Sequence, residues 1–125
     1  MAEIIIQPDC GNSPKKLFLK NLYIAYAEAD SEFVTANVPE QVSWERIGRD
    51  QLTGNEKFIE AMRSYKLWNV RRLVVDAIIT HGVDASVNGR VLCSDRSEYA
   101  FCDVYRFVSA GKFDIRTITS FLIRL

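Results

Sequence analysis

Residues that build metal centres and disulfide frameworks are scarce in this chain. It has one histidine and three cysteines in 125 residues, and no C-x-x-C pair occurs. An odd, scattered set of thiols with a single imidazole does not fit the usual Cys/His zinc patterns. We therefore expect no metal ion, reduced cysteines and a cytoplasmic location.

An excess of one charge is also absent, because sixteen Lys and Arg residues balance sixteen Asp and Glu residues. Without a basic stripe the chain lacks the electrostatic footprint of a nucleic-acid-binding protein. Its longest apolar runs, such as Leu73-Val74-Val75, are far shorter than the ~20 residues of a spanning helix. The first residues also lack the basic start and apolar core of a secretory signal. We expect neither nucleic acid nor a membrane as partner.

The length of the chain, 125 residues, indicates a single domain over residues 1–125. Pro8, Gly11 and Asn12 predict that residues 1–13 form a loose N-terminal leader. Ser13 followed by Pro14 is typical of a helix start, the serine as N-cap and the proline at the first helical position. Spacing of apolar residues and caps predicts helices over residues 14–29, 32–36 and 56–65.

Apolar residues alternate with a period of two in most of the remaining chain. This pattern predicts a first strand over 42–47 and then four long strands over 70–81, 85–93, 98–109 and 113–124. Short connections between long strands indicate antiparallel hairpins. The expected fold is α+β: a curved antiparallel sheet covered on one face by three N-terminal helices. A curled sheet of this kind encloses a cone with an open mouth, which is a common site for small ligands.

One carboxylate interrupts an aromatic stripe in the strand Y-A-F-C-D-V-Y-R-F. Strand alternation puts Tyr99, Phe101, Asp103, Tyr105 and Phe107 on one face. An unpaired charge there would be costly to bury, so Asp103 is partnered, protonated or on the wall of a cavity. A proton-transfer role and a structural pairing, for example with Arg72 or the Tyr105 hydroxyl, both remain open.

Two segments resemble the nuclear transport factor 2-like superfamily, also called SnoaL-like or ketosteroid-isomerase-like, which has a cystatin-like fold. Val42-Ser43-Trp44-Glu45-Arg46-Ile47-Gly48 with Leu52-Thr53-Gly54 and the helix Glu56-Lys57-Phe58-Ile59 looks like its "V-x-W-x-x-x-G … L-x-G-x-x-x-I" segment. Residues 101–107 with Gly111-Lys112-Phe113-Asp114-Ile115 look like its "D-x-x-x-F … G-K-I" hairpin. The resemblance implies a cone-shaped α+β barrel and a homodimer, but the fold hosts many activities.

The ketosteroid isomerases offer the sharpest comparison for a site. In them an Asp in an apolar site stays protonated and donates a hydrogen bond to an oxyanion, and Asp103 lies in the matching D-x-x-R-F context. Their general-base Asp precedes a glycine by three residues, as Glu45 precedes Gly48, although strand alternation with Trp44 points Glu45 outward. Their helix-one tyrosine lies eight residues before the Asp that ends that helix. Counting back eight residues from Asp30 gives Leu22, so Tyr23 is one position away, a rotation of roughly 100° on a helix.

Asp103 is therefore the catalytic candidate, with Glu45 a second one that strand alternation disfavours. His81, beside a turn glycine, is the one side chain whose unperturbed pKa lies near neutrality. The remaining expected pocket residues are aromatic, aliphatic or hydroxyl side chains of the helices and strands. The full expected ligand-binding set is Tyr23, Tyr26, Trp44, Phe58, Met62, Phe101, Tyr105, His81 and Thr119.

Two functional hypotheses follow from these observations. The first is a protein that binds a small, largely apolar organic ligand, with cofactor-free acid–base chemistry at Asp103 if it is an isomerase, cyclase or lyase such as a dehydratase. The second is a non-catalytic binding or interaction module. Apolar residues on both faces of the strand 113–124 indicate that one face meets the helices and the other a second copy of the chain.

Overall fold

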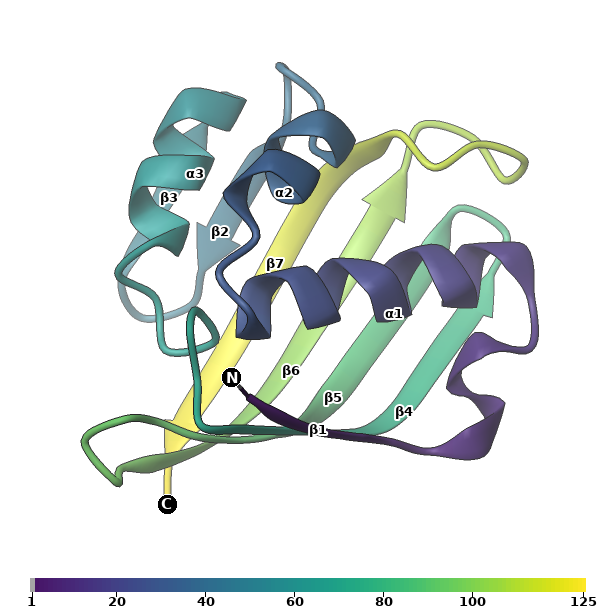
Figure 1. The fold of residues 1–125 in the computed structure, drawn as a ribbon. Helices are drawn as coiled ribbons and strands as arrows, with labels where there is room; N and C mark the ends of the chain where they lie inside the picture. The colour runs from purple at the N-terminus through teal and green to yellow at the C-terminus, as the bar shows by residue number, and fades with distance from the viewer. Residues whose placement is uncertain (1) are drawn as a thin grey trace.

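The first helix begins where the sequence predicts. In the computed structural model, which describes residues 2–125, α1 spans Pro14–Ala27. The extended Ser13 accepts a hydrogen bond from the backbone N–H of Lys16 at 3.4 Å, and Pro14 occupies the first helical position. The helix stops two residues before the predicted end because Ala29 has left-handed backbone geometry, with φ of 56°. α1 lies across one face of the sheet (Figure 1).

The two shorter helices are also present. Asp30 caps α2 (Ser31–Asn37) by accepting from the backbone N–H of Phe33 at 3.1 Å. Gly54, with φ of 99°, turns the chain into α3 (Asn55–Met62). Both helices lie over the end of the sheet that β2 and β3 form (Figure 1). The three predicted helices are thus confirmed, with α3 ending three residues early.

Seven strands form one curved sheet in the order β1-β4-β5-β6-β7-β2-β3. The four long strands are the antiparallel hairpins that the alternating pattern predicts. The strands are β1 (Glu3–Ile6), β2 (Ser43–Arg46), β3 (Asp50–Thr53), β4 (Arg72–His81), β5 (Asp84–Leu92), β6 (Glu98–Phe107) and β7 (Ile115–Arg124).

The edges of the sheet correct three sequence-based expectations. Within the expected loose leader, β1 pairs in parallel with β4, and a 3₁₀ turn (Pro8–Gly11) follows it and buries Cys10. β2 pairs in parallel with β7, so the sheet is mixed rather than wholly antiparallel. β3 was not expected, because its four residues are mostly exposed and show no apolar alternation.

Two register shifts change which side chains face the helices. One lies between Val75 and Ala77 in β4, and the other lies where Phe107 of β6 meets Ile115 of β7. A bulge adds one residue to a strand and interrupts its alternation. Ile115 and Ile118 are consequently both buried, although strict alternation predicts opposite faces for them.

A buried lysine fastens α1 to two turns of the sheet. The side chain of Lys15, on a residue that is 8% exposed, donates from Nζ to the carbonyl oxygens of Gly82 at 3.0 Å and Ala110 at 2.9 Å. Its ammonium also lies 4.4 Å from the centroid of the Phe107 ring. These contacts join the N-terminal end of α1 to the β4–β5 and β6–β7 turns.

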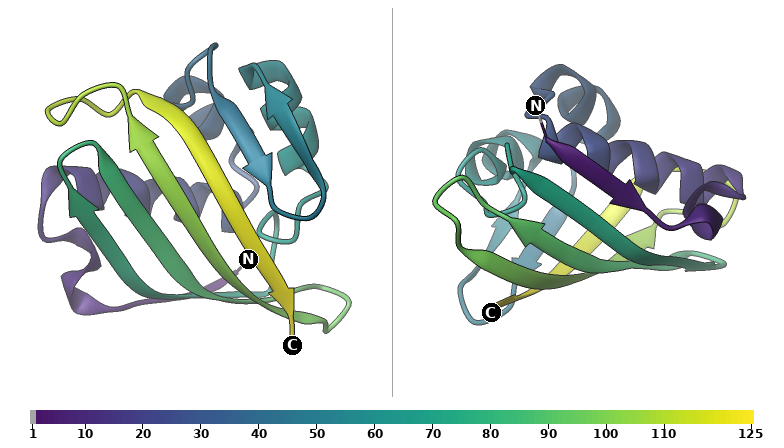
Figure 2. Two further views of the ribbon diagram at one scale, coloured as in Figure 1. Left: turned by 180° about the vertical axis from the view of Figure 1, so that it is seen from behind. Right: turned by 60° about the horizontal axis from the view of Figure 1, so that its bottom comes forward.

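The hydrophobic core lies between the helices and the concave inner face of the sheet, where aromatic side chains of α1, β2 and β6 meet. The opposite, outer face of β4–β7 carries no helix (Figure 2, left). Among the residues described, no helix combines the length and apolar character needed to cross a membrane.

Candidate functional site

The inner face of β6 brings one acid into the aromatic core. Asp103 is only 3% exposed, and its Oδ2 accepts a hydrogen bond from the hydroxyl of Tyr23 on α1. The Tyr23 oxygen lies 2.8 Å from the hydroxyl oxygen of Tyr105, two residues along β6 from the acid. Because Tyr23 has one proton and gives it to Asp103, the Tyr105 hydroxyl is the donor in that second bond. A chain of two tyrosines therefore ends on the carboxyl group.

Burial dominates the electrostatics of this group. It raises the pKa of Asp103 from 3.8 to about 6, although polar contacts from Tyr23 and Ser120 act in the opposite direction. Burial first, and then the nearby charge of Asp103, raise the pKa of Tyr23 well above its ordinary value. The acid thus changes protonation state close to neutral pH while the tyrosines stay protonated as donors.

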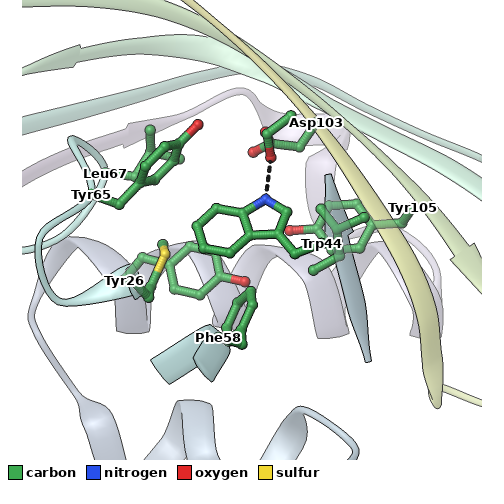
Figure 3. Close-up of a pocket in the computed structure, with 10 residues that line it drawn as sticks. Tyr26, Trp44, Phe58, Tyr65, Leu67, Asp103 and Tyr105 are labelled. Atoms are coloured by element: carbon green, nitrogen blue, oxygen red, sulfur yellow. Dashed lines mark hydrogen bonds between the residues drawn. The ribbon is translucent and has the colours of Figure 1, made fainter. Parts of the chain in front are cut away.

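Asp103 lines a small cavity, and in the described part of the chain its second carboxylate oxygen is unpaired. Oδ1 of Asp103 is buried and has no hydrogen-bond partner among the residues described. The cavity has a volume of about 10 Å³, enough for about one water molecule. Figure 3 shows its lining, with Asp103 above the ring of Trp44 and beside Tyr65. The lining residues are Tyr26, Trp44, Phe58, Met62, Tyr65, Leu67, Asp103, Tyr105, Ile118 and Ser120.

Trp44 of β2 is the largest side chain in this wall. Its indole Nε1 donates to Oγ of Ser120 on β7 at 2.8 Å, the dashed line in Figure 3. Its ring packs against Phe58 of α3 and Tyr65, with centroids 4.8 and 5.0 Å away. The interior that was expected to be an open cone is thus largely filled by aromatic side chains around one small hollow.

Most of the expected pocket residues gather around this hollow. Tyr26, Trp44, Phe58, Met62 and Tyr105 line it directly. Behind them, Tyr23 stacks on Phe101 with ring centroids 5.6 Å apart and holds the acid.

Three of the predicted site residues lie elsewhere, which corrects those expectations. Glu45 is exposed and pairs in register with Thr119, so both point to the outer face. His81 is exposed at the end of β4, beside the turn. Trp44 faces inward and Glu45 outward as strand alternation predicts, so the structure does not support Glu45 as a base acting with Asp103.

The helix-one tyrosine needs a different correction. Spacing along the helix indicates that no tyrosine of α1 meets the acid in the isomerase manner. The structure instead brings the Tyr23 hydroxyl onto Asp103. Residue counting back from Asp30 is a poor guide here because the helix ends at Ala27 and the chain turns at Ala29.

Sequence reasoning also missed four residues near the site. Tyr65 and Leu67 follow α3 in an irregular segment, where no periodic pattern reveals orientation. Ser120 and Arg46 are polar, and such side chains are mostly exposed in proteins, yet both are buried here. Two signals would have found them: Ser120 pairs with Asp103 on the neighbouring strand, and Arg46 lies two residues after Trp44 and so shares its face.

Within residues 2–125, no group of three or more His, Cys, Asp or Glu side chains could hold a metal ion. The polar groups at the hollow are instead one carboxyl, one serine hydroxyl and several phenols. Hydrogen bonding and proton transfer at Asp103 are the chemistry that this arrangement provides.

Solved structures share the fold at low sequence identity. A nuclear transport factor 2-like protein of unknown function from Burkholderia xenovorans matches with a TM-score of 0.76 and 9% identity over 87% of this chain and 82% of its own. A proposed ketosteroid isomerase from Kribbella flavida matches with a TM-score of 0.73 and 16% identity over 86% and 76%. An epoxide hydrolase from Mycobacterium tuberculosis, described as LEH-like, matches with a TM-score of 0.64 and 14% identity over 83% and 78%.

No protein-family model and no curated protein sequence matches the chain. The structural matches show that it has the nuclear transport factor 2-like α+β fold, which confirms the fold expected from the sequence. At these identities they establish the fold alone, because this fold supports several unrelated chemistries.

Proposed function

We propose that this protein binds a small, largely apolar organic molecule in the hollow beside Asp103 and hydrogen-bonds its oxygen atom there. The observation that carries the proposal is the Asp103 carboxyl group: it is 3% exposed, its Oδ2 is hydrogen-bonded by Tyr23, and its Oδ1 has no hydrogen-bond partner among residues 2–125. A buried acid with a raised pKa beside a hollow is typical of functional sites. Structural neighbours that include a proposed ketosteroid isomerase and an epoxide hydrolase are consistent with it.

The small volume of the hollow requires a wall side chain to move when a ligand binds. Met62 is the most adaptable candidate, because an unbranched thioether side chain repacks readily, and it ends α3. Asp103 then serves as the proton-transfer group for a carbonyl compound, without a cofactor, in an isomerase-, cyclase- or lyase-type reaction. The Tyr23 hydroxyl positions the carboxyl group.

Binding is tested with phenol and cyclohexanone, followed through the indole N–H resonance of Trp44 with that of Trp68 as internal reference. Phenol donates to the ionised carboxylate, so it binds better above pH 6. Cyclohexanone accepts from the protonated acid, so it binds better below pH 6.

Asp103→Asn weakens phenol binding at pH 8 roughly tenfold, since a bond to a charged group is lost. The exposed Asp95→Asn is the control. Absence of a saturable Trp44 shift with both probes would refute the proposal.

Proton transfer is tested by hydrogen–deuterium exchange at the carbon next to the cyclohexanone carbonyl in D₂O. A general acid–base group contributes about 10²–10⁴-fold, so Asp103→Asn lowers the protein-catalysed exchange rate by that factor. If the native protein binds cyclohexanone but exchange proceeds only at the rate in buffer, the proton-transfer role is refuted and the binding role remains.

A second candidate function, an interaction module that dimerises through its sheet, is favoured by the outer face. Four exposed apolar side chains, which we call the outer patch, lie on β4, β6 and β7: Ile79, Val104, Phe121 and Ile123. Phe121 and Ile123 also line a hollow of about 380 Å³ on this face. Exposed apolar patches of this kind mark association sites, and we propose that a second copy of the chain covers the outer patch.

We also propose a cytoplasmic location, because the three unpaired cysteines fit a reducing setting.

A further inference from the structure

Four polar side chains form one row across the inner face of the sheet. Asp103 on β6 pairs in register with Ser120 on β7, Ser120 with Arg46 on β2, and Arg46 with Asp50 on β3. Neighbouring strands lie about 4.8 Å apart, so the backbones of Asp103 and Arg46 are separated by about 10 Å. The row therefore runs from Asp103 and Ser120, which line the hollow, to Arg46 and Asp50 on the β2–β3 hairpin beside it.

Two members of this row, Asp103 and Arg46, carry an unused hydrogen-bonding group. Within residues 2–125, Oδ1 of Asp103 and Nη1 of Arg46 are the two buried side-chain polar atoms without a partner. Arg46 is 6% exposed and Asp103 3% exposed. Leaving a buried polar group unpaired costs about 1–3 kcal/mol, more if it is charged. Two such groups in one row, and none outside it in the described part of the chain, indicate an arrangement that a ligand completes.

The guanidinium of Arg46 is oriented so that Nη1 remains available. Its Nε donates to Oδ1 of Asp50 at 2.7 Å and its Nη2 to Oδ2 at 2.5 Å. This bidentate pair occupies one edge of the planar group, and Nη1 lies on the other. The guanidinium carbon lies 5.1 Å from the centroid of the Trp44 ring and 6.0 Å from that of Tyr65. Both rings are walls of the hollow.

We propose that Arg46 is a second ligand-binding residue of this site, and that the ligand is a compact ring bearing oxygen groups at opposite ends, one of them a carbonyl or carboxylate. One oxygen meets Asp103, and the carbonyl or carboxylate accepts from Nη1 of Arg46. The ligand's ring enters at the contact between Trp44 and Tyr65, whose ring centroids lie 5.0 Å apart, so these two side chains separate when it binds. This inference rests on the proposed binding function and names the class of molecule that the hollow accepts.

Charge in the row decides how such a ligand binds. Arg46 and Asp50 neutralise each other, so a carboxylate competes with Asp50 for the guanidinium. The ligand's carboxylate is also repelled by the negative charge of Asp103 when that acid is ionised. For a carboxylate ligand whose other oxygen accepts a hydrogen bond, binding therefore favours protonated Asp103 and is accompanied by proton uptake between pH 6 and 7.

The test compares 4-hydroxybenzoate with phenol, which lacks the second oxygen group, by calorimetry and the Trp44 indole resonance. Arg46→Met lowers the affinity for 4-hydroxybenzoate roughly tenfold or more and leaves phenol affinity within about twofold, since only one bond to a charged donor is lost. Asp50→Asn removes the competing carboxylate and raises the affinity for 4-hydroxybenzoate, which keeps the test valid if Arg46→Met fails to fold.

The outcomes separate this inference from the proposed function. If phenol binds in an Asp103-dependent manner but 4-hydroxybenzoate gains nothing from Arg46 or from Asp50→Asn, the Arg46 assignment is overturned and the binding function stands. If neither probe binds native protein, both are overturned. Loss of 4-hydroxybenzoate affinity in Arg46→Met with unchanged phenol affinity supports the assignment.

Discussion

At the residue scale, Asp103 is held in a state that favours chemistry over stability. Its Oδ1 has no partner and its pKa is about 6, so a buried charge persists at neutral pH. An apolar residue would fit the surrounding aromatic side chains at a lower free-energy cost. Tyr23 offsets part of that cost through its hydrogen bond to Oδ2. Replacing Asp103 by an uncharged residue is therefore the change that separates the effect of this carboxyl group on stability from its effect on function.

The pH dependence of stability gives the first prediction. The pKa of Asp103 is about 6 in the folded protein, against 3.8 ordinarily, so the folded state holds the extra proton between these values. The free energy of unfolding therefore falls as pH rises from about 4 to 6, by about 3 kcal/mol from this residue.

Urea unfolding at pH 4, 5, 6 and 7 checks this, with Asp103→Asn as the variant and Asp95→Asn as control. The fall over this range disappears in Asp103→Asn relative to native protein. It persists in Asp95→Asn, because hydrogen bonds from Ser97 hold the pKa of that exposed carboxyl below its ordinary value and outside the window. Parallel curves for native protein and Asp103→Asn would contradict the assignment.

At the element scale, the bend of the sheet depends on a close approach of β5 to β4. Gly89 pairs with Val75, next to the register shift between Val75 and Ala77. A Cβ atom at Gly89 would lie 1.9 Å from the carbonyl oxygen of Val74. The backbone of the neighbouring strand occupies that space, so a side chain cannot be accommodated by a simple rotamer change.

Gly89→Ala accordingly forces the two strands apart and lowers the free energy of unfolding by about 3 kcal/mol or more. Gly111→Ala is the matched control, since no atom lies within 4 Å of its added Cβ and its φ is not positive; its effect stays within about 1 kcal/mol. Chemical denaturation of both variants measures this. Equal stabilities would show that the approach of β4 and β5 is not tight.

At the scale of the whole molecule, the two faces of the sheet differ in what covers them. The helices and the aromatic core cover the inner face (Figure 1), whereas the outer face of β4–β7 carries no helix (Figure 2, left). Phe121 pairs with Cys102 and Ile123 with Ala100 across β6 and β7, which makes a contiguous weakly polar surface. A self-complementary contact between two such faces is the simplest way to remove it from water.

Self-association through the outer patch is the corresponding prediction. Phe121→Asp, at a residue that is 43% exposed, converts the dimer to monomer in sedimentation velocity experiments by placing a charge in the contact. Leu17→Asp, at a residue of α1 that is 46% exposed, leaves the dimer intact. A native protein that sediments as a monomer at high concentration would refute the sheet-to-sheet contact.

Local patterns in the sequence determined the helices, the four long strands and the face that Asp103 occupies. Caps at Ser13 and Asp30 and a period of two in residues 98–107 depend on neighbouring residues alone, so they can be recognised without the fold. Tertiary structure decided what these patterns do not contain: the pairing of β1 with β4 and of β3 with β2, the bulges, the hydrogen bond from Tyr23 to Asp103, and the size of the hollow. Each depends on residues distant in the chain meeting in space, where packing and hydrogen bonding, rather than periodicity, set the outcome.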